Sequence, residues 1–306
     1  MKKSFSFLIM GLVLLCAFYG TVYAEEQPGI PRVSFLGPEG TYTQEAAQFF
    51  FHDGESLMPR ETVTLAISDV LSGGSDYAVI PQENTVGGPV ADYLDELICT
   101  DGVYVVGEVV IPISQTLMGV PGSTLDDIRT VCSHTQGIIQ SAKWRGINLP
   151  DAEEVEMPST AAAASYVAEQ QDRSIAAVAA PGAAALYGLE VLAEDVQITD
   201  TNKTRFYVLS KAQLQEKGLI RAIFVVTCAG SEIDDVIVAV HEEGLELVAL
   251  HDRPEGSSLG EYHFVMECED PDGVTDAQIA AVSNLEGVHF LGCFNTVEKS
   301  TGGTED

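Results

Sequence analysis

Two short segments of this sequence place hydroxyl and amide side chains at the start of an expected helix. Residues 37–44 form a glycine-rich turn before a helix, and Thr41 and Gln44 have the spacing of a capping box. Ser133 and Gln136 repeat that spacing, which makes Ser133 a candidate N-cap. The first amides of a helix lack intrahelical partners and carry partial positive charge. Both positions could therefore hold an anion, although a purely structural cap has the same pattern.

Residues 84–89 carry an amide and a hydroxyl beside two glycines. Asn84 and Thr85 supply the polar side chains, and the glycines let the backbone approach a ligand closely. With Gly88 as N-cap and Pro89 at the first helical position, the next helix would begin here.

Thr204, Arg205 and Phe206 open a strand after a polar loop. Arg205 is one of eight arginines in a chain that is poor in cations. A single arginine on a strand is more often a surface charge, and a ligand-binding protein without catalytic activity would show all of these segments. The residue types therefore indicate a site for a small anion and do not decide between binding and catalysis.

The elements that would position these residues alternate between strand and helix. From residue 32 to residue 210 the pattern is that of an α/β fold, with two lobes facing a cleft. Strands are expected at 32–36, 77–81, 104–117, 174–180 and 204–210, and helices from 42, at 89–99, 136–144 and 160–170. After a polar bridge, residues 221–299 follow the order strand, helix, strand, strand, helix, strand. That order is typical of a ferredoxin-like βαββαβ domain.

Residues 1–24 have the pattern of a secretory signal peptide. Lys2 and Lys3 precede an apolar run, and small residues before Glu25 form a cleavage site after Ala24. We expect export to the periplasm or the extracellular space. An uncleaved membrane anchor is the alternative, because a run of about 20 apolar residues can span a bilayer.

The charge of the chain limits its partners. With 46 acidic and 15 basic residues the net charge is −31, and loss of the two N-terminal lysines makes it −33. Electrostatic repulsion excludes nucleic acid as a partner. It also repels an anionic substrate, so an anion site must be built locally from arginine, helix N-termini and backbone amides.

Five cysteines follow the signal segment, and none has C-x-x-C spacing. We therefore expect no metal site. Three of the five, Cys228, Cys268 and Cys293, fall on expected strands of the C-terminal domain. Both a disulfide and buried free thiols are compatible with that placement.

In order and identity these segments resemble the prephenate dehydratase family across residues 32–210. The matching pieces are residues 37–42, 81–85, 133–136, 159–161 and 202–206, the last of which contains the Thr-Arg-Phe signature. Members of this family are two-lobed α/β proteins similar to periplasmic binding proteins, with the active site between the lobes and an ACT domain after them.

The resemblance implies conversion of prephenate to phenylpyruvate, CO2 and water in phenylalanine biosynthesis, without a cofactor or metal. It implies that Thr204 is the catalytic residue. It also implies a set of substrate-binding residues: Thr41, Asn84, Thr85, Ser133, Gln136, Arg205 and Phe206. A hydroxyl such as that of Thr204 can polarise a leaving hydroxide by hydrogen bonding.

The C-terminal segment resembles a phenylalanine-binding ACT domain only in part. Its effector positions are His251, Asp252, Arg253 and Pro254, where the family has Glu-Ser-Arg-Pro. Ser231 and Glu232 replace smaller uncharged residues, and Glu232 adds negative charge where the carboxylate of an amino acid would bind. We expect weak or absent phenylalanine binding. Because ACT domains commonly pair between subunits, we expect a homodimer or homotetramer.

Other functions stay open. Dehydration of arogenate uses the same groups, and an exported binding protein could capture a small anion without turnover. The Thr-Arg-Phe signature favours an enzyme, because a binding protein needs no donor for a leaving group. Prephenate is normally a cytoplasmic intermediate, so a cytoplasmic chain with a misassigned start is the alternative to export.

Overall fold

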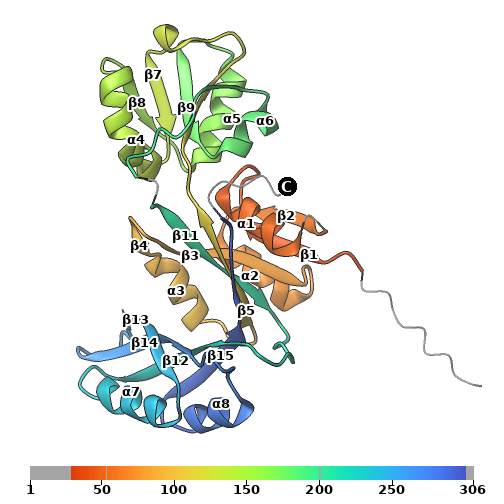
Figure 1. Ribbon diagram of the computed structural model, residues 1–306, viewed down its shortest axis with the longest axis vertical. Helices are drawn as coiled ribbons and strands as arrows, with labels where there is room; N and C mark the ends of the chain where they lie inside the picture. Colours follow the sequence, from red (N-terminus) through yellow and green to blue (C-terminus); the bar gives the residue numbers. More distant parts are fainter. Residues whose placement is uncertain (1–28, 53, 200, 301–306) are drawn as a thin grey trace, which may run out of the picture.

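The computed structural model describes residues 29–52, 54–199 and 201–300 of the chain. Figure 1 shows them as three units stacked along the long axis. The predicted signal peptide, residues 1–24, lies outside the described residues. Within the described ranges, no helix has the length and apolar character needed to cross a membrane.

The N-terminal lobe, at the centre of Figure 1, is a mixed sheet covered by three helices. Its strands are β1 (Arg32–Leu36), β2 (Ser56–Arg60), β3 (Tyr77–Asn84), β4 (Gly88–Pro89), β5 (Tyr104–Pro112) and β11 (Lys203–Ser210). Its helices are α1 (Tyr42–Phe51), α2 (Val63–Ser72) and α3 (Ala91–Ile98). Strand β11 lies antiparallel between β3 and β5, in the order β5-β11-β3-β1-β2. Helices cover both faces, which explains why these strands are continuous apolar runs.

The middle lobe, at the top of Figure 1, has its own five-stranded sheet in the order β10-β6-β9-β7-β8. Its strands are β6 (Thr116–Gly119), β7 (Thr130–Ser133), β8 (Glu153–Glu156), β9 (Ile175–Ala179) and β10 (Glu190–Ala193). Its helices are α4 (Thr135–Asn148), α5 (Thr160–Gln170), α6 (Pro181–Tyr187) and the 3-10 turn η1 (Leu125–Asp127). Buried alanines of α5 and β9 share one core cluster, because their small side chains let helix and sheet approach closely.

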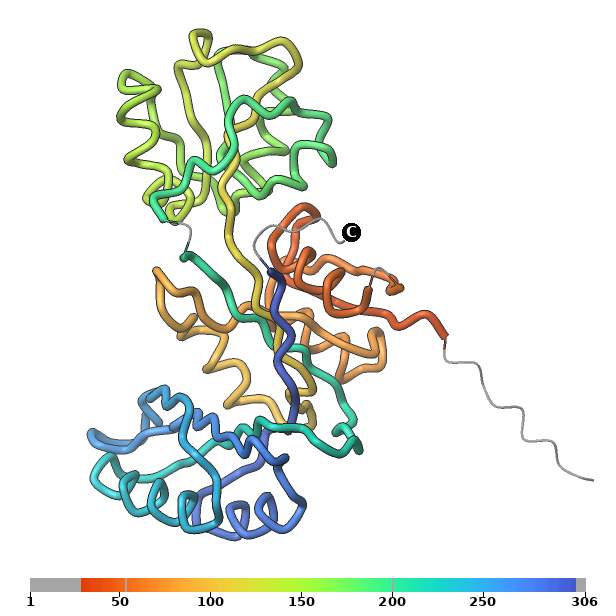
Figure 2. Tube along the Cα trace, in the orientation of Figure 1, coloured from red at the N-terminus to blue at the C-terminus, as the bar shows by residue number. Residues whose placement is uncertain are grey.

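The chain crosses between the two lobes twice. The run predicted as one strand over 104–117 divides into β5 in one lobe and β6 in the other, with residues 113–115 between them. The second passage enters β11, and Figure 2 shows the two passages next to each other. The two-lobed α/β fold predicted from the sequence is confirmed.

The C-terminal domain, residues 221–299, has the predicted βαββαβ order. It contains β12 (Arg221–Ala229), α7 (Ile233–Glu242), β13 (Glu246–Pro254), β14 (Glu261–Glu269), α8 (Asp276–Ser283) and β15 (Val288–Phe294). The strand order is β13-β14-β12-β15, and both helices cover the same face in Figure 1.

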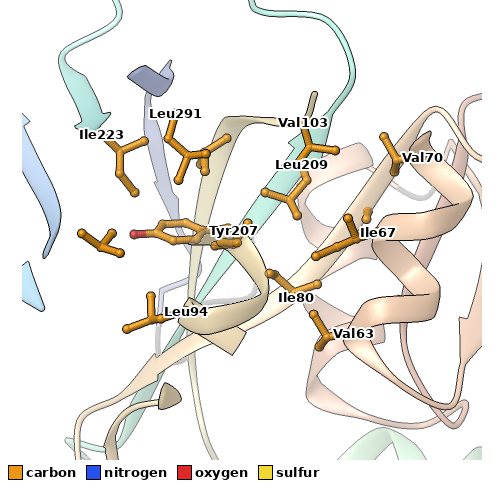
Figure 3. Packing of buried hydrophobic residues seen from close by; sticks show 14 of the residues in the cluster. Val63, Ile67, Val70, Ile80, Leu94, Val103, Tyr207, Leu209, Ile223 and Leu291 are labelled. Atoms are coloured by element: carbon orange, nitrogen blue, oxygen red, sulfur yellow. The ribbon is translucent and has the colours of Figure 1, made fainter. Parts of the chain in front are cut away.

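This domain is continuous with the N-terminal lobe. Strand β15 pairs with β5 at Gly292 and Val105, and β16 (Thr296–Glu298) adds to β5 as well. One hydrophobic cluster contains residues of both units, and Figure 3 shows the Tyr207 ring extending between Leu94 and Ile223. The two units therefore share a core.

Two predicted helix starts were wrong. Gly88 and Pro89 form strand β4 against β3, and α3 begins two residues later with Val90 as its N-cap. The chain reverses first because Asn84 Oδ1 accepts hydrogen bonds from the amides of Val86 and Gly87, and Gly88 adopts a φ of 75°.

Ser133 is not the N-cap of α4. Strand β7 runs through Ser133, whose buried hydroxyl donates to the carbonyl of Val178 at 2.6 Å. The next residue, His134, is the cap, and its Nδ1 accepts from the amide of Gln136.

The five cysteines in the described ranges are free thiols. Cys132 and Cys268 are buried, and this burial raises the pKa of Cys132 to about 11 and that of Cys268 to about 12.

Candidate active site

A cavity of about 600 Å³ is lined by residues of both the N-terminal and the middle lobe. The starts of four helices contribute to its wall: residues 41–43 of α1, 90–92 of α3, His134, Gln136 and Gly137 of α4, and Ser159 and Thr160 of α5. Each helix N-terminus carries partial positive charge from its unpaired amides. The cavity therefore has the electrostatics of an anion site.

Side-chain caps fix the starts of α1, α4 and α5, whereas α3 has no side-chain cap. Thr41 Oγ1 accepts from the amide of Gln44 at 3.4 Å, and Gln44 Oε1 accepts in return from the amide of Gly40 at 2.6 Å. Ser159 Oγ accepts from the amide of Ala162 at 3.0 Å. The sequence pattern predicted the cap at Thr41 but not the cap at Ser159, and both residues line the same cavity.

Among the described residues that line this cavity, none is lysine or arginine. Asp92 adds a negative charge, and His134 contributes an imidazole to the lining. Attraction for an anion must therefore come chiefly from helix amides and neutral donors.

Thr204 and Asn84 are part of the wall that the N-terminal lobe contributes. They lie opposite each other on β11 and β3, and Asn84 Nδ2 donates to Thr204 Oγ1 at 2.9 Å. The same amide nitrogen donates to Asn202 Oδ1 at 2.8 Å, which fixes its orientation. Since Thr204 Oγ1 accepts this hydrogen bond, its own hydroxyl hydrogen is left to donate toward the cavity.

Phe206, two residues after Thr204 on β11, also lines the cavity. Arg205 lies between them and has different partners, because successive side chains of a strand point to opposite faces. Its guanidinium contacts Glu83, Glu108 and Glu267 and does not line the cavity. The structure thus separates Arg205 from the residues with which the sequence grouped it.

The charge state of Arg205 follows from these contacts. Burial lowers the pKa of its guanidinium, but attraction to Glu267 and Glu108 outweighs that effect and raises the pKa above its ordinary value.

The other predicted substrate-binding residues divide in the same way. Gln136 and Thr41 line the cavity. Thr85 and Ser133 do not: Thr85 Oγ1 donates to the carbonyl of Thr201 at 3.2 Å, and the Ser133 hydroxyl is bonded to backbone. Both are placed to support the wall from behind.

The two lobes come close at the loop 85–88. A Cβ added to Gly87 would lie 2.8 Å from Nε2 of Gln136 on the other lobe. An added Cβ would displace the end of the Gln136 side chain, so the Gln136 amide lies directly beside the loop that Asn84 organises.

Sequence reasoning missed a row of glutamines along the cavity. Gln115 Nε2 donates to Gln140 Oε1 at 2.9 Å, and Gln140 Nε2 lies 3.5 Å from Gln136 Oε1. The spacing of four between Gln136 and Gln140 on a helix could have indicated Gln140. Gln115 lies in the passage between lobes and carries no such signal. Tyr42 and Tyr93 also line the cavity, and burial raises the pKa of the Tyr42 hydroxyl, which donates to the carbonyl of Ser114.

Two of the four predicted effector residues, His251 and Arg253, contact the N-terminal lobe. Arg253 donates from Nε and Nη2 to the two carboxylate oxygens of Asp95, each at 2.6 Å. Nε2 of His251 lies 3.3 Å from Nε2 of Gln82. These two side chains of β13 therefore join the C-terminal domain to α3 and β3.

Sequence comparison places this arrangement among known proteins. A family model described as prephenate dehydratase matches residues 33–214. The prephenate dehydratase of Amycolatopsis methanolica is 35% identical over 277 residues, with 86% of this chain and 88% of that protein covered. A bifunctional chorismate mutase/prephenate dehydratase of Neisseria gonorrhoeae is 33% identical over 240 residues, which cover 78% of this chain and 66% of the relative.

Solved structures agree in fold. The prephenate dehydratase of Arthrobacter aurescens, solved in complex with L-Phe, is 30% identical and matches with a TM-score of 0.77 over 86% of this chain and 89% of its own. A protein described as a novel type of quorum quenching acylase is 26% identical, also with a TM-score of 0.77, over 87% of this chain and 98% of its own. The family model covers more than half of the chain, and the Amycolatopsis enzyme is matched over most of its length. This chain therefore belongs to the prephenate dehydratase family.

Proposed function

We propose that this chain is a carbon–oxygen lyase that converts prephenate to phenylpyruvate, CO2 and water. One observation carries the proposal: the Thr204 hydroxyl is oriented by Asn84 in the wall of a cavity at which four helix N-termini meet. Membership of the prephenate dehydratase family supplies the substrate class.

The site matches the needs of this reaction. Prephenate is a dianion, and amides at the helix starts offer its carboxylates hydrogen bonds without a buried cation. In the reaction the bond from the ring to its carboxylate breaks and releases CO2. The electron pair of that bond enters the ring as the ring carbon–oxygen bond breaks, and the leaving hydroxide takes a proton to become water.

Thr204 would assist the second bond cleavage. A hydroxyl has too high a pKa to transfer its proton fully, but it can donate a hydrogen bond that strengthens as negative charge develops on the leaving oxygen. The electrons balance within the substrate, so the reaction needs no redox cofactor.

The experiment is an assay of the purified chain from Glu25 onward with prephenate and, separately, with arogenate. Prephenate turnover gives phenylpyruvate, which is measured by its absorbance in alkali, and arogenate turnover gives phenylalanine. Phenylpyruvate formation with a clear preference for prephenate is the expected result. A preference for arogenate would mean that arogenate, and not prephenate, is the substrate. Binding of either compound without turnover would mean that the chain is a binding protein.

Acyl transfer is a control reaction for the same assay, because one similar structure is described as an acylase. A threonine nucleophile needs a base that takes its proton. The hydrogen bond that Thr204 Oγ1 receives comes from an amide, which cannot do so. We therefore expect no acylase activity.

We also propose that the C-terminal domain is ACT-like and binds phenylalanine weakly or not at all. Glu232 adds a negative charge at the start of α7, and Arg253 is already paired with Asp95. Calorimetry with the purified protein should give no saturable heat at micromolar phenylalanine; a micromolar dissociation constant would refute this.

Assembly and location follow the sequence pattern. We propose a homodimer or homotetramer, since β13 is the edge strand of its sheet and exposes Leu247 and Val248. Light scattering after gel filtration measures the mass.

We propose export with cleavage after Ala24, and N-terminal sequencing of the protein from its native host tests it: a start at Met1 in the cytoplasm would refute export.

A further inference from the structure

A charged cluster lies behind the cavity wall, where the N-terminal lobe meets the C-terminal domain. We call Arg205, Arg221, Glu83, Glu108 and Glu267 the arginine–carboxylate cluster. Arg205 Nη2 contacts Glu267 Oε2 at 2.5 Å, Nη1 contacts Glu83 Oε2 at 3.0 Å, and Nε donates to Glu108 Oε2 at 2.8 Å. Each nitrogen of this guanidinium thus has a carboxylate partner, and its plane is fixed.

Glu267 is the member that the C-terminal domain contributes. It lies on β14 and is fully buried. Its second oxygen, Oε1, accepts a hydrogen bond from the Tyr207 hydroxyl at 2.6 Å, and Arg221 Nη1 lies 3.4 Å from Oε2. A buried carboxylate is tolerated only with such partners.

Two members of the cluster are sequence neighbours of the proposed catalytic pair: Arg205 follows Thr204 on β11, and Glu83 precedes Asn84 on β3. Arg205 pairs with Glu83 in the register between β11 and β3, and the preceding pair is Thr204 with Asn84. The register shifts immediately after Arg205, so hydrogen bonding of the ladder is interrupted at this point. Side-chain contacts of Arg205 and Glu83 therefore help to hold the two strands in place where Thr204 receives its hydrogen bond.

The contact between Glu267 and β11 is supported by packing. Tyr207, two residues from Arg205, is also fully buried, and Figure 3 shows its ring extending between Leu94 of α3 and Ile223 of β12. Strand β11 thus contacts the C-terminal domain through Arg205 and Tyr207, which are neighbours on one face of the strand. Both side chains bond to Glu267.

We propose that Glu267 is a positioning residue: through Arg205 it holds the segment of β11 that orients the Thr204 hydroxyl toward substrate. The inference rests on the proposed lyase function. It makes the C-terminal domain part of the catalytic geometry whether or not that domain binds an effector.

The test is Glu267→Gln in the full mature chain, which keeps the shape of the side chain and removes its charge. We expect kcat to fall about tenfold to a hundredfold with KM within about twofold, because a small displacement of a reacting group lowers turnover more than binding. The matched control is Glu269→Gln on the same strand, whose carboxylate contacts Arg221 Nε at 3.3 Å and not Arg205. This control should retain wild-type kcat.

A purely structural role is distinguished by Tyr207→Phe. This variant removes a hydrogen bond from Glu267 and leaves the contact between Glu267 and Arg205, so the melting temperature should fall while kcat stays within about threefold of wild type. If kcat instead follows melting temperature across the three variants, Glu267 only stabilises the fold and the proposal is overturned.

Hydrogen exchange gives a readout that does not depend on turnover. In Glu267→Gln, amides of the peptide that contains Thr204 and Arg205 should exchange faster, whereas those of the middle lobe should not change. An inactive wild-type enzyme would defeat the proposed function and leave this measurement to decide the positioning role. Unchanged exchange in the Thr204 peptide would overturn it.

Discussion

At the scale of single residues, strand alternation decides which side chains can meet substrate. Thr204 and Phe206 share the face of β11 that lines the cavity, and Arg205 is on the opposite face with three carboxylates. The motif Thr-Arg-Phe is contiguous in sequence, but its parts face two different environments. Sequence similarity identified the motif but could not show that Arg205 lies outside the cavity lining. The Arg205 partners Glu108 and Glu267 are distant from it in the sequence.

Asn84→Asp should lower kcat about tenfold to a hundredfold. An aspartate cannot donate to Thr204 Oγ1, and as an acceptor it would draw the threonine hydroxyl hydrogen away from the cavity. Steady-state kinetics measure the effect. Asn148→Asp, at the exposed end of α4, is the matched control and should keep wild-type kcat. Equal kinetics for wild type and Asn84→Asp would show that Asn84 does not orient the hydroxyl.

At the scale of elements, the sequence pattern predicted most of the strands and both helices of the C-terminal domain, because turn residues and periodicity mark their ends. The pattern failed where pairing with a neighbouring strand sets the start of a helix. Gly88 and Pro89 pair with β3 as strand β4, so α3 begins after them, and β7 extends through Ser133. Strand β2 and helix α2 were not predicted at all, although Thr62 caps α2 through its hydroxyl.

Helix α4 gives a test of packing at the cavity wall. Gly137→Ala should lower the melting temperature, because the added Cβ would lie 2.2 Å from Ser133 Oγ, a buried atom that is bonded to Val178. Gly146→Ala on the same helix is the control: nothing lies within 4 Å of its new Cβ, and alanine favours helix by about 0.5–1 kcal/mol. Thermal unfolding of both variants should therefore give changes of opposite sign. A Gly137→Ala protein as stable as wild type would contradict the packing described here.

At the scale of the whole molecule, two lobes line the cavity, and the charged cluster behind its wall contains residues of both the N-terminal lobe and the C-terminal domain. The shared core and the contacts of Glu267 and Arg253 join the C-terminal domain to the catalytic lobe. The sequence predicted three units in order, since each has its own pattern of elements. It could not predict these contacts, which depend on how separate units pack.

The contact between Asp95 and Arg253 should make this junction sensitive to acid. The Arg253 guanidinium holds the pKa of Asp95 below its ordinary value of 3.8, so the pair stabilises the fold above that pH and loses its contribution as pH falls through the lowered value. Because the Asp95 side chain is 44% exposed, solvent screening limits the contribution to about 0.5 kcal/mol. The free energies of unfolding of wild type and Asp95→Asn, measured with denaturant, should differ at pH 7 and converge as the pH falls below 3.8 and through the lowered pKa of Asp95. If the difference in free energy of unfolding between the two proteins grew on acidification, this prediction would be wrong.

In the proposed reaction, the Thr204 hydroxyl assists departure of the substrate hydroxide. The most direct test of this role is the rate of phenylpyruvate formation from prephenate by wild type, Thr204→Ser and Thr204→Ala. Thr204→Ser keeps the hydroxyl and should retain measurable turnover, whereas Thr204→Ala should lose about a hundredfold or more in kcat with substrate binding little changed. A Thr204→Ala enzyme with wild-type kcat would contradict the account.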